Sequence, residues 1–145
     1  MTPTNYALYA GTFASMSLLL RFGGRPERAA VLLVAASLLL EPIAGGITLN
    51  TWRIGTAALN LGLMAGLWVM AEKWDRWWLV LASSLQLIVV LTHLMPVMAP
   101  EFGVNTGVTI RLLMWALIIF SMFFGAWEAS ADRYWSSPNP RQVPS

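Results

Sequence analysis

The sequence predicts an all-α polytopic membrane protein, a bundle of five transmembrane helices. Of its 145 residues, 57% are hydrophobic and only 11% are charged, whereas a soluble domain carries about 25% charged residues. Most of its apolar runs exceed the roughly 10–14 residues of an ordinary core helix. The start of the chain lacks the basic region of a cleavable signal peptide, so we expect the first predicted helix to be retained. The expected location is therefore the cell membrane, multi-pass, in a bacterial inner membrane.

The five predicted helices are separated by glycine, proline or charged residues. They cover residues 5–22, 28–43, 53–71, 77–95 and 106–127. The third is long enough to cross a hydrocarbon core of about 30 Å at ~1.5 Å per residue. The second reaches Pro42 near its end; if the segment from Glu41 to Gly46 is re-entrant, the bundle has four spans instead. Residues 1–128 form the predicted transmembrane domain.

Residues 129–145 are polar and contain three prolines, so we expect an irregular tail. The orientation follows from the basic residues, because cytoplasmic loops are enriched in Lys and Arg. Most of them fall on one side of the predicted threading: Arg21, Arg25, Arg28, Lys73, Arg76, Arg133 and Arg141. This predicts an amino terminus outside and a cytoplasmic carboxyl terminus.

Small residues at four-residue spacing indicate faces where two helices approach closely. They occur on the first predicted helix around Gly11 and on the third at Ala58, Gly62 and Gly66. We expect these two helices to pair. The alternative is chance, since such spacing is common in helices rich in Ala and Gly.

Five ionisable residues gather toward the outer side of the predicted bundle: Glu41, Arg53, His93, Glu101 and Arg111. Charges in the apolar layer are costly, so such a cluster is a candidate site for an anion, a proton or a lipid head group. In that interpretation Glu41 pairs with Arg53 or Arg111. In the alternative, the arginines extend to the lipid head groups and Glu41 balances one of them. Arg111 precedes an apolar run, so it needs a carboxylate, a phosphate or a partner protein.

His93 is the only histidine and the chain has no cysteine. One imidazole is sufficient for five-coordinate binding of a haem or another metal-containing pigment. The alternative is a hydrogen-bonded histidine at the membrane interface. No zinc site is expected, because no partners stand at ligand spacing. The sequence requires no cofactor, and a lipid or a pigment is the candidate ligand.

Asn60 and Gln86 fall near the middle of their predicted helices. An amide pair at matching depth would join the two helices, for about 0.5–1 kcal/mol. The alternative is a polar wall along a conduction path, together with Thr56, Ser83 and Ser84.

No catalytic constellation can be built from these residues, so we do not expect an enzyme. The first hypothesis for function is a non-catalytic accessory subunit within a larger membrane complex, in contact with lipids and other subunits and not with nucleic acid. The alternatives are a small oligomeric transporter or channel with the outer cluster as its site, and a component that binds pigment, haem or lipid through His93.

Overall fold

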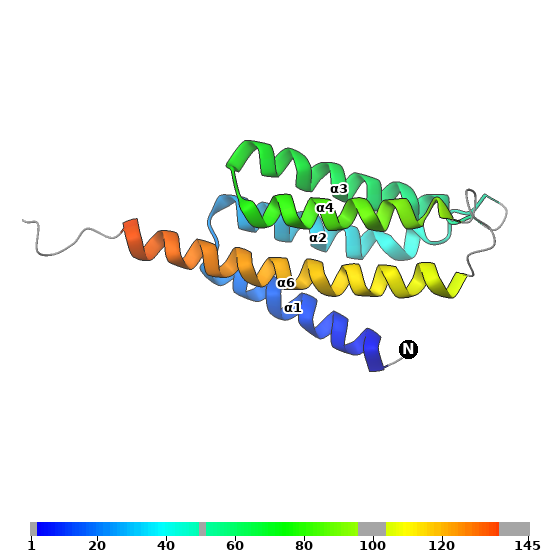
Figure 1. Cartoon of the computed structure of the whole chain (residues 1–145), viewed down its shortest axis with the longest axis horizontal. Helices are drawn as coiled ribbons and strands as arrows, with labels where there is room; N and C mark the ends of the chain where they lie inside the picture. Colours follow the sequence, from blue (N-terminus) through cyan, green and yellow to red (C-terminus); the bar gives the residue numbers. More distant parts are fainter. Residues whose placement is uncertain (1–2, 50–51, 96–103, 137–145) are drawn as a thin grey trace, which may run out of the picture.

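The computed structural model describes residues 3–49, 52–95 and 104–136, and these residues are helical except for short connections. The helices are α1 (Pro3–Phe22), α2 (Arg25–Ala44), α3 (Ile54–Trp74), α4 (Trp77–Thr92) and α6 (Val104–Ser136), as Figure 1 shows. An isolated bridge joins Leu49 and Trp52 between α2 and α3. The predicted all-α bundle is confirmed.

Two described helices are long and apolar enough to cross a membrane, Ile54–Trp74 and Thr106–Asp132. They suggest a membrane location only weakly, because a soluble core helix can have the same length and composition. α4 has only 16 residues, and α2 includes four charged residues along its 20 positions. The crossing of a membrane by all five helices therefore stays a prediction.

Helix α2 begins earlier than predicted because its first turn is capped. The Glu27 carboxylate Oε2 accepts a hydrogen bond of 2.7 Å from the backbone N–H of Gly24, which satisfies a donor that the helix leaves unpaired. Pro26 fits in the first turn, where its missing N–H costs no hydrogen bond. The helix also continues through Pro42 to Ala44, since a proline in the last turn disrupts few helical hydrogen bonds.

The other helix ends also differ from the prediction. α3 continues into the charged run and ends at Trp74. The next residue, Asp75, has a left-handed backbone conformation with a φ of 48°. α4 ends at Thr92, three residues earlier than predicted. α6 runs to Ser136, so the first part of the predicted irregular tail is helical. Residues 137–145 lie outside the described part of the chain.

Helix α4 packs against both α3 and α6, and it is drawn between them in Figure 1. Its aromatic residue Trp78 is buried and lies over Gly125 of α6, where an added Cβ would be 2.6 Å from the indole ring. A side chain at position 125 would force the two helices apart. The apolar core extends from this contact through Leu79, Leu67 and Met122.

The predicted pairing of the first and third helices is wrong, because α1 packs mainly against α6 and α3 packs against α2 and α4. Gly11 faces Ile119 of α6, and Gly66 faces Leu33 of α2. At Gly62 an added Cβ would meet no atom within 4 Å, and Ala58 is exposed. The regular spacing of small residues indicates a helix face without large side chains, but it does not identify the helix that packs against this face.

The two ends of the bundle have different chemistry. One end holds the connections after α1 and after α3 (Figure 1). There Arg76 forms ion pairs with Glu27 at 3.6 Å, with Glu128 at 3.2 Å and with Asp132. The hydrogen bond to Asp132 is the largest of the interactions that raise the pKa of Arg76 above its usual value, and burial opposes them. These ion pairs connect α2 and α6 to the connection between α3 and α4.

Candidate functional site

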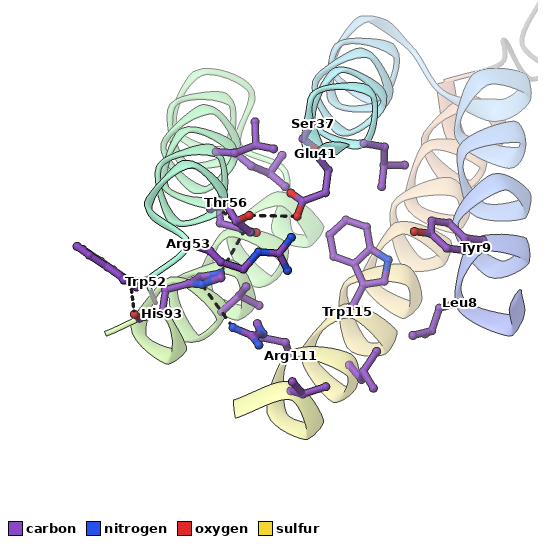
Figure 2. Close-up of a pocket in the computed structure, with 17 residues that line it drawn as sticks. Leu8, Tyr9, Ser37, Glu41, Trp52, Arg53, Thr56, His93, Arg111 and Trp115 are labelled. Carbon is purple, nitrogen blue, oxygen red and sulfur yellow. Dashed lines mark hydrogen bonds between the residues drawn. The ribbon is translucent and has the colours of Figure 1, made fainter. Parts of the chain in front are cut away.

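A cavity of about 520 Å³ lies toward the opposite end of the bundle, and residues from all five helices line it. Its walls are mostly apolar. They include Leu8, Leu38, Leu59, Leu63, Val89, Leu112 and Trp115. Helix α1 contributes Leu8 and Tyr9, so even the helix farthest from α3 takes part in the cavity (Figure 2).

Two arginines enter this cavity from different elements. Arg111 is on α6, and Arg53 stands just before the first residue of α3. The Arg53 guanidinium also lies against the end of α2, because an added Cβ at Gly45 would be 2.7 Å from Nη2. The carbonyl end of a helix carries partial negative charge, which favours a cation there. Figure 2 shows both guanidinium groups on the side of the cavity that holds Glu41 and His93.

Glu41 lines the same cavity, but the predicted ion pair is not formed. Its Oε1 accepts a hydrogen bond of 3.3 Å from the hydroxyl of Thr56. Neither Arg53 nor Arg111 forms an ion pair within 4.0 Å with a carboxylate of the described residues. The charged residues of the cavity are thus near one another without a direct contact between carboxylate and guanidinium. Glu101, the fifth member of the predicted outer cluster, lies outside the described residues.

His93 follows the last residue of α4 and is buried. Its Nε2 is 3.4 Å from the amide nitrogen of Asn60, and its Nδ1 is 3.4 Å from Nη1 of Arg111. Its backbone carbonyl accepts a hydrogen bond of 2.9 Å from the indole of Trp52. A metal bond to either ring nitrogen would have to displace one of these two side chains. The haem or pigment ligand stays a prediction that this geometry does not favour.

Asn60 and Gln86 lie together between α3 and α4. The Gln86 side-chain nitrogen donates a hydrogen bond of 2.7 Å to Oδ1 of Asn60, and Asn60 donates one of 2.8 Å to the backbone carbonyl of Thr56. Gln86 is fully buried, and its Oε1 has no hydrogen-bond partner in the described structure. We call Gln86, Asn60, His93 and Arg111 the polar chain, since each contacts the next.

The conduction-path alternative receives little support from the serines. The hydroxyls of Ser83 and Ser84 donate hydrogen bonds to the carbonyl of Val80 within their own helix. Neither serine lines the cavity, whereas Thr56 does. The polar groups of α3 and α4 are therefore arranged as a chain of contacts that meets the cavity at Asn60 and His93 and continues to Arg111 of α6.

Several cavity residues were not predicted from the sequence. Trp115 is one turn beyond Arg111 on the same face of α6, and its indole donates a hydrogen bond of 3.2 Å to the hydroxyl of Thr12. The four-residue spacing between an arginine and a tryptophan in an apolar helix was the available signal. Leu8, Tyr9 and Ser37 had no such signal, because their position depends on how α1 and α2 pack.

No cluster of His, Cys, Asp or Glu among the described residues is suited to a metal ion. Comparisons of the chain with protein-family models, with curated proteins and with solved structures find no match. The function proposed below therefore rests on the geometry of the cavity.

Proposed function

We propose that this chain is a membrane protein that binds a hydrophobic small molecule or a lipid in the cavity at one end of its bundle. The observation that carries the proposal is the cavity itself. Ligand sites typically have about 300–1,000 Å³, apolar walls and a few convergent polar groups. The cavity has about 520 Å³ and combines such walls with Glu41, Arg53, Asn60, His93 and Arg111.

The outward faces of the helices support a membrane environment. Each helix exposes large apolar side chains, among them Phe13, Leu39, Val69, Leu87 and Phe120. In water, exposed apolar surface of this extent would be unfavourable. Acyl chains or partner subunits would cover it. Helices of 20 residues, such as α1 and α2, span about 30 Å.

We propose five spans, with the amino terminus outside and α6 ending in the cytoplasm. The exposed basic residues Arg21, Arg25, Arg28 and Lys73 belong to the end of the bundle opposite the cavity, which supports this orientation. α4 is the shortest of the described helices. It packs against α3 and α6 and exposes apolar side chains such as Leu81 and Leu87 on its outer face. The cavity would then face the outer leaflet.

The accessory-subunit hypothesis and the transporter hypothesis both stay predictions. Exposed apolar faces fit lipid as well as neighbouring subunits, so they do not distinguish the first hypothesis from ligand binding. The cavity, in contrast, directly indicates a bound molecule. For this reason ligand binding is preferred to the accessory-subunit and transporter hypotheses.

The test is to fill the cavity from one helix position and to compare a neighbouring position outside it. Leu59 lines the cavity, whereas Leu61 on the same helix is exposed on the outer face. The wild type, Leu59→Trp and Leu61→Trp are purified in mild detergent and studied by native mass spectrometry and solvent extraction. A bound molecule other than detergent should remain in the wild type and Leu61→Trp and disappear in Leu59→Trp.

Equal helix content and a single oligomeric species for both variants serve as the folding control. Equal amounts of bound molecule in the two variants, or none in the wild type after membrane extraction and lipid supplementation, would contradict the proposal.

A further inference from the structure

The charges that line the cavity do not balance. Two guanidinium groups, Arg53 and Arg111, share the space with one carboxylate, Glu41. Glu41 is engaged by the hydroxyl of Thr56 at 3.3 Å. The described lining therefore carries a net formal charge of +1 when His93 is neutral (+2 from the arginines and −1 from Glu41).

No carboxylate lies within 4.0 Å of the Arg111 guanidinium in the described part of the chain. The hydrogen-bonding contact of its side chain there is with the imidazole Nδ1 of His93, at 3.4 Å. A guanidinium has five N–H donors, and an imidazole offers one acceptor at most. Arg53 and Glu41 line the same cavity, so Arg111 is repelled by the first and attracted by the second. Two like charges beside apolar walls are costly, and Glu41 can offset only one of them, so a second anion in the cavity would be favoured.

The position of the arginines relative to the apolar walls indicates the shape of the ligand. On α3, the apolar cavity residues Leu59 and Leu63 come six and ten residues after Arg53. At ~1.5 Å per residue, Leu63 lies about 15 Å along the helix from Arg53. On α6, Leu112 and Trp115 follow Arg111 in the same direction, away from the amino end of α6. The charged groups thus lie toward one end, where Trp52 and Val108 also line the cavity, and apolar walls extend from them into the bundle.

We infer that the ligand of this cavity is an amphiphile with one anionic head group, a carboxylate or a phosphate, which Arg53 and Arg111 bind while the apolar part lies among Leu59, Leu63 and Val89. This inference rests on the proposed function, since it identifies the ligand class of the same site. Arginine binds carboxylates and phosphates through two parallel N–H···O bonds. A cation would be repelled by the net positive charge of the described lining, and a neutral ligand would leave that charge of +1 without compensation.

The test measures binding of tritiated dodecanoate and, separately, of tritiated dodecanol to the purified full-length protein in a maltoside detergent. The competitors have a common chain length but different head groups: unlabelled dodecanoate, dodecyl phosphate, dodecanol and dodecyltrimethylammonium. Lysophosphatidate with a dodecanoyl chain and inorganic phosphate distinguish a lipid head group from a free anion. Dodecanoate and dodecyl phosphate should compete at least about tenfold better than dodecanol, since hydrogen bonds to a charged group contribute about this factor.

Arg111→Gln and Arg53→Gln should each weaken dodecanoate binding by about tenfold and leave dodecanol binding unchanged. Arg25→Gln is the matched control, because Arg25 is exposed at the opposite end of the bundle, and it should bind dodecanoate like the wild type. Equal competition by dodecanol and dodecanoate would overturn the inference of an anionic head group but would leave the proposed function standing. Absence of displaceable binding for both labelled probes would overturn the proposed function, and the inference with it.

Discussion

The amide nitrogen of Gln86 on α4 donates a hydrogen bond of 2.7 Å to the amide oxygen of Asn60 on α3. Asn60 in turn contacts His93, and His93 contacts Arg111. A buried polar pair near the centre of the bundle is thus continuous with the polar side of the cavity. Its removal is expected to affect both the packing of α3 against α4 and the position of the cavity residues.

The Asn60–Gln86 pair predicts an order of destabilisation. Gln86→Leu should lower the free energy of unfolding by about 0.5–1 kcal/mol, which is typical of one interhelical hydrogen bond in a membrane protein. Asn60→Leu should cost more, about 1–3 kcal/mol, because it leaves both polar atoms of the fully buried Gln86 amide without a hydrogen-bond partner in the described structure. Steric-trap unfolding in bicelles would measure both. Equal costs, or a larger cost for Gln86→Leu, would contradict this interpretation.

The ion pairs of Arg76 predict a strong effect at the other end of the bundle. Arg76→Met would leave the Glu27 carboxylate, which is 1% exposed, without its cation. The expected loss is about 2–3 kcal/mol, below the 3–5 kcal/mol of fully buried pairs because Arg76 is partly exposed. The double variant Glu27→Gln with Arg76→Met should recover part of this loss. Additive costs in the same unfolding assay would show that the two side chains do not interact.

Two glycines in the bundle should respond in opposite ways to the same substitution. Gly125→Ala places a Cβ against the ring of Trp78 and should cost about 1–3 kcal/mol through overpacking between α4 and α6. Gly62→Ala meets nothing within 4 Å and should be neutral or stabilising by up to about 1 kcal/mol, because alanine favours a helix. Thermal unfolding in detergent compares them directly. A Gly62→Ala variant as unstable as Gly125→Ala would indicate a partner that covers that face.

Much of the fold could be predicted from composition and helix-breaking residues, since runs of apolar residues between glycines and prolines leave few alternatives to a helical bundle. The positions of the helix ends could be predicted less well from the sequence, because they depend on tertiary contacts. Glu128 and Asp132 are four residues apart on one face of α6, and both reach Arg76. This contact explains why the helix continues into a segment that is polar in sequence.

Part of the site could also be predicted. Residues at the same depth in antiparallel helices come together, which is why Glu41, Arg53, His93 and Arg111 line one cavity. Their pairing could not be predicted, because depth does not determine direction around a helix axis. Glu41 turns toward Thr56 of the adjacent helix, and no sequence pattern marked this hydroxyl as its partner.

The proposed orientation predicts a simple labelling pattern, and the natural chain has no cysteine to interfere. Gly46→Cys and Lys73→Cys place single thiols at exposed positions at opposite ends of the bundle. A membrane-impermeant maleimide applied to intact cells should label Gly46→Cys and should reach Lys73→Cys only after lysis. The reverse labelling pattern would indicate the opposite topology. Labelling of both variants in intact cells would contradict a membrane barrier between the two ends of the bundle.

The most direct test of a ligand site inside the bundle is thiol protection at Ser37, a cavity residue on α2. Ser37→Cys is a small change, and Ser84→Cys on the exposed face of α4 is its control. The alkylation rate of each thiol by N-ethylmaleimide is measured in detergent with and without saturating dodecanoate or dodecanol. If the cavity binds a ligand, at least one of these two compounds should slow alkylation of Ser37→Cys at least severalfold and leave the rate at Ser84→Cys unchanged. Unchanged rates at Ser37→Cys with both compounds would contradict a ligand site in the cavity.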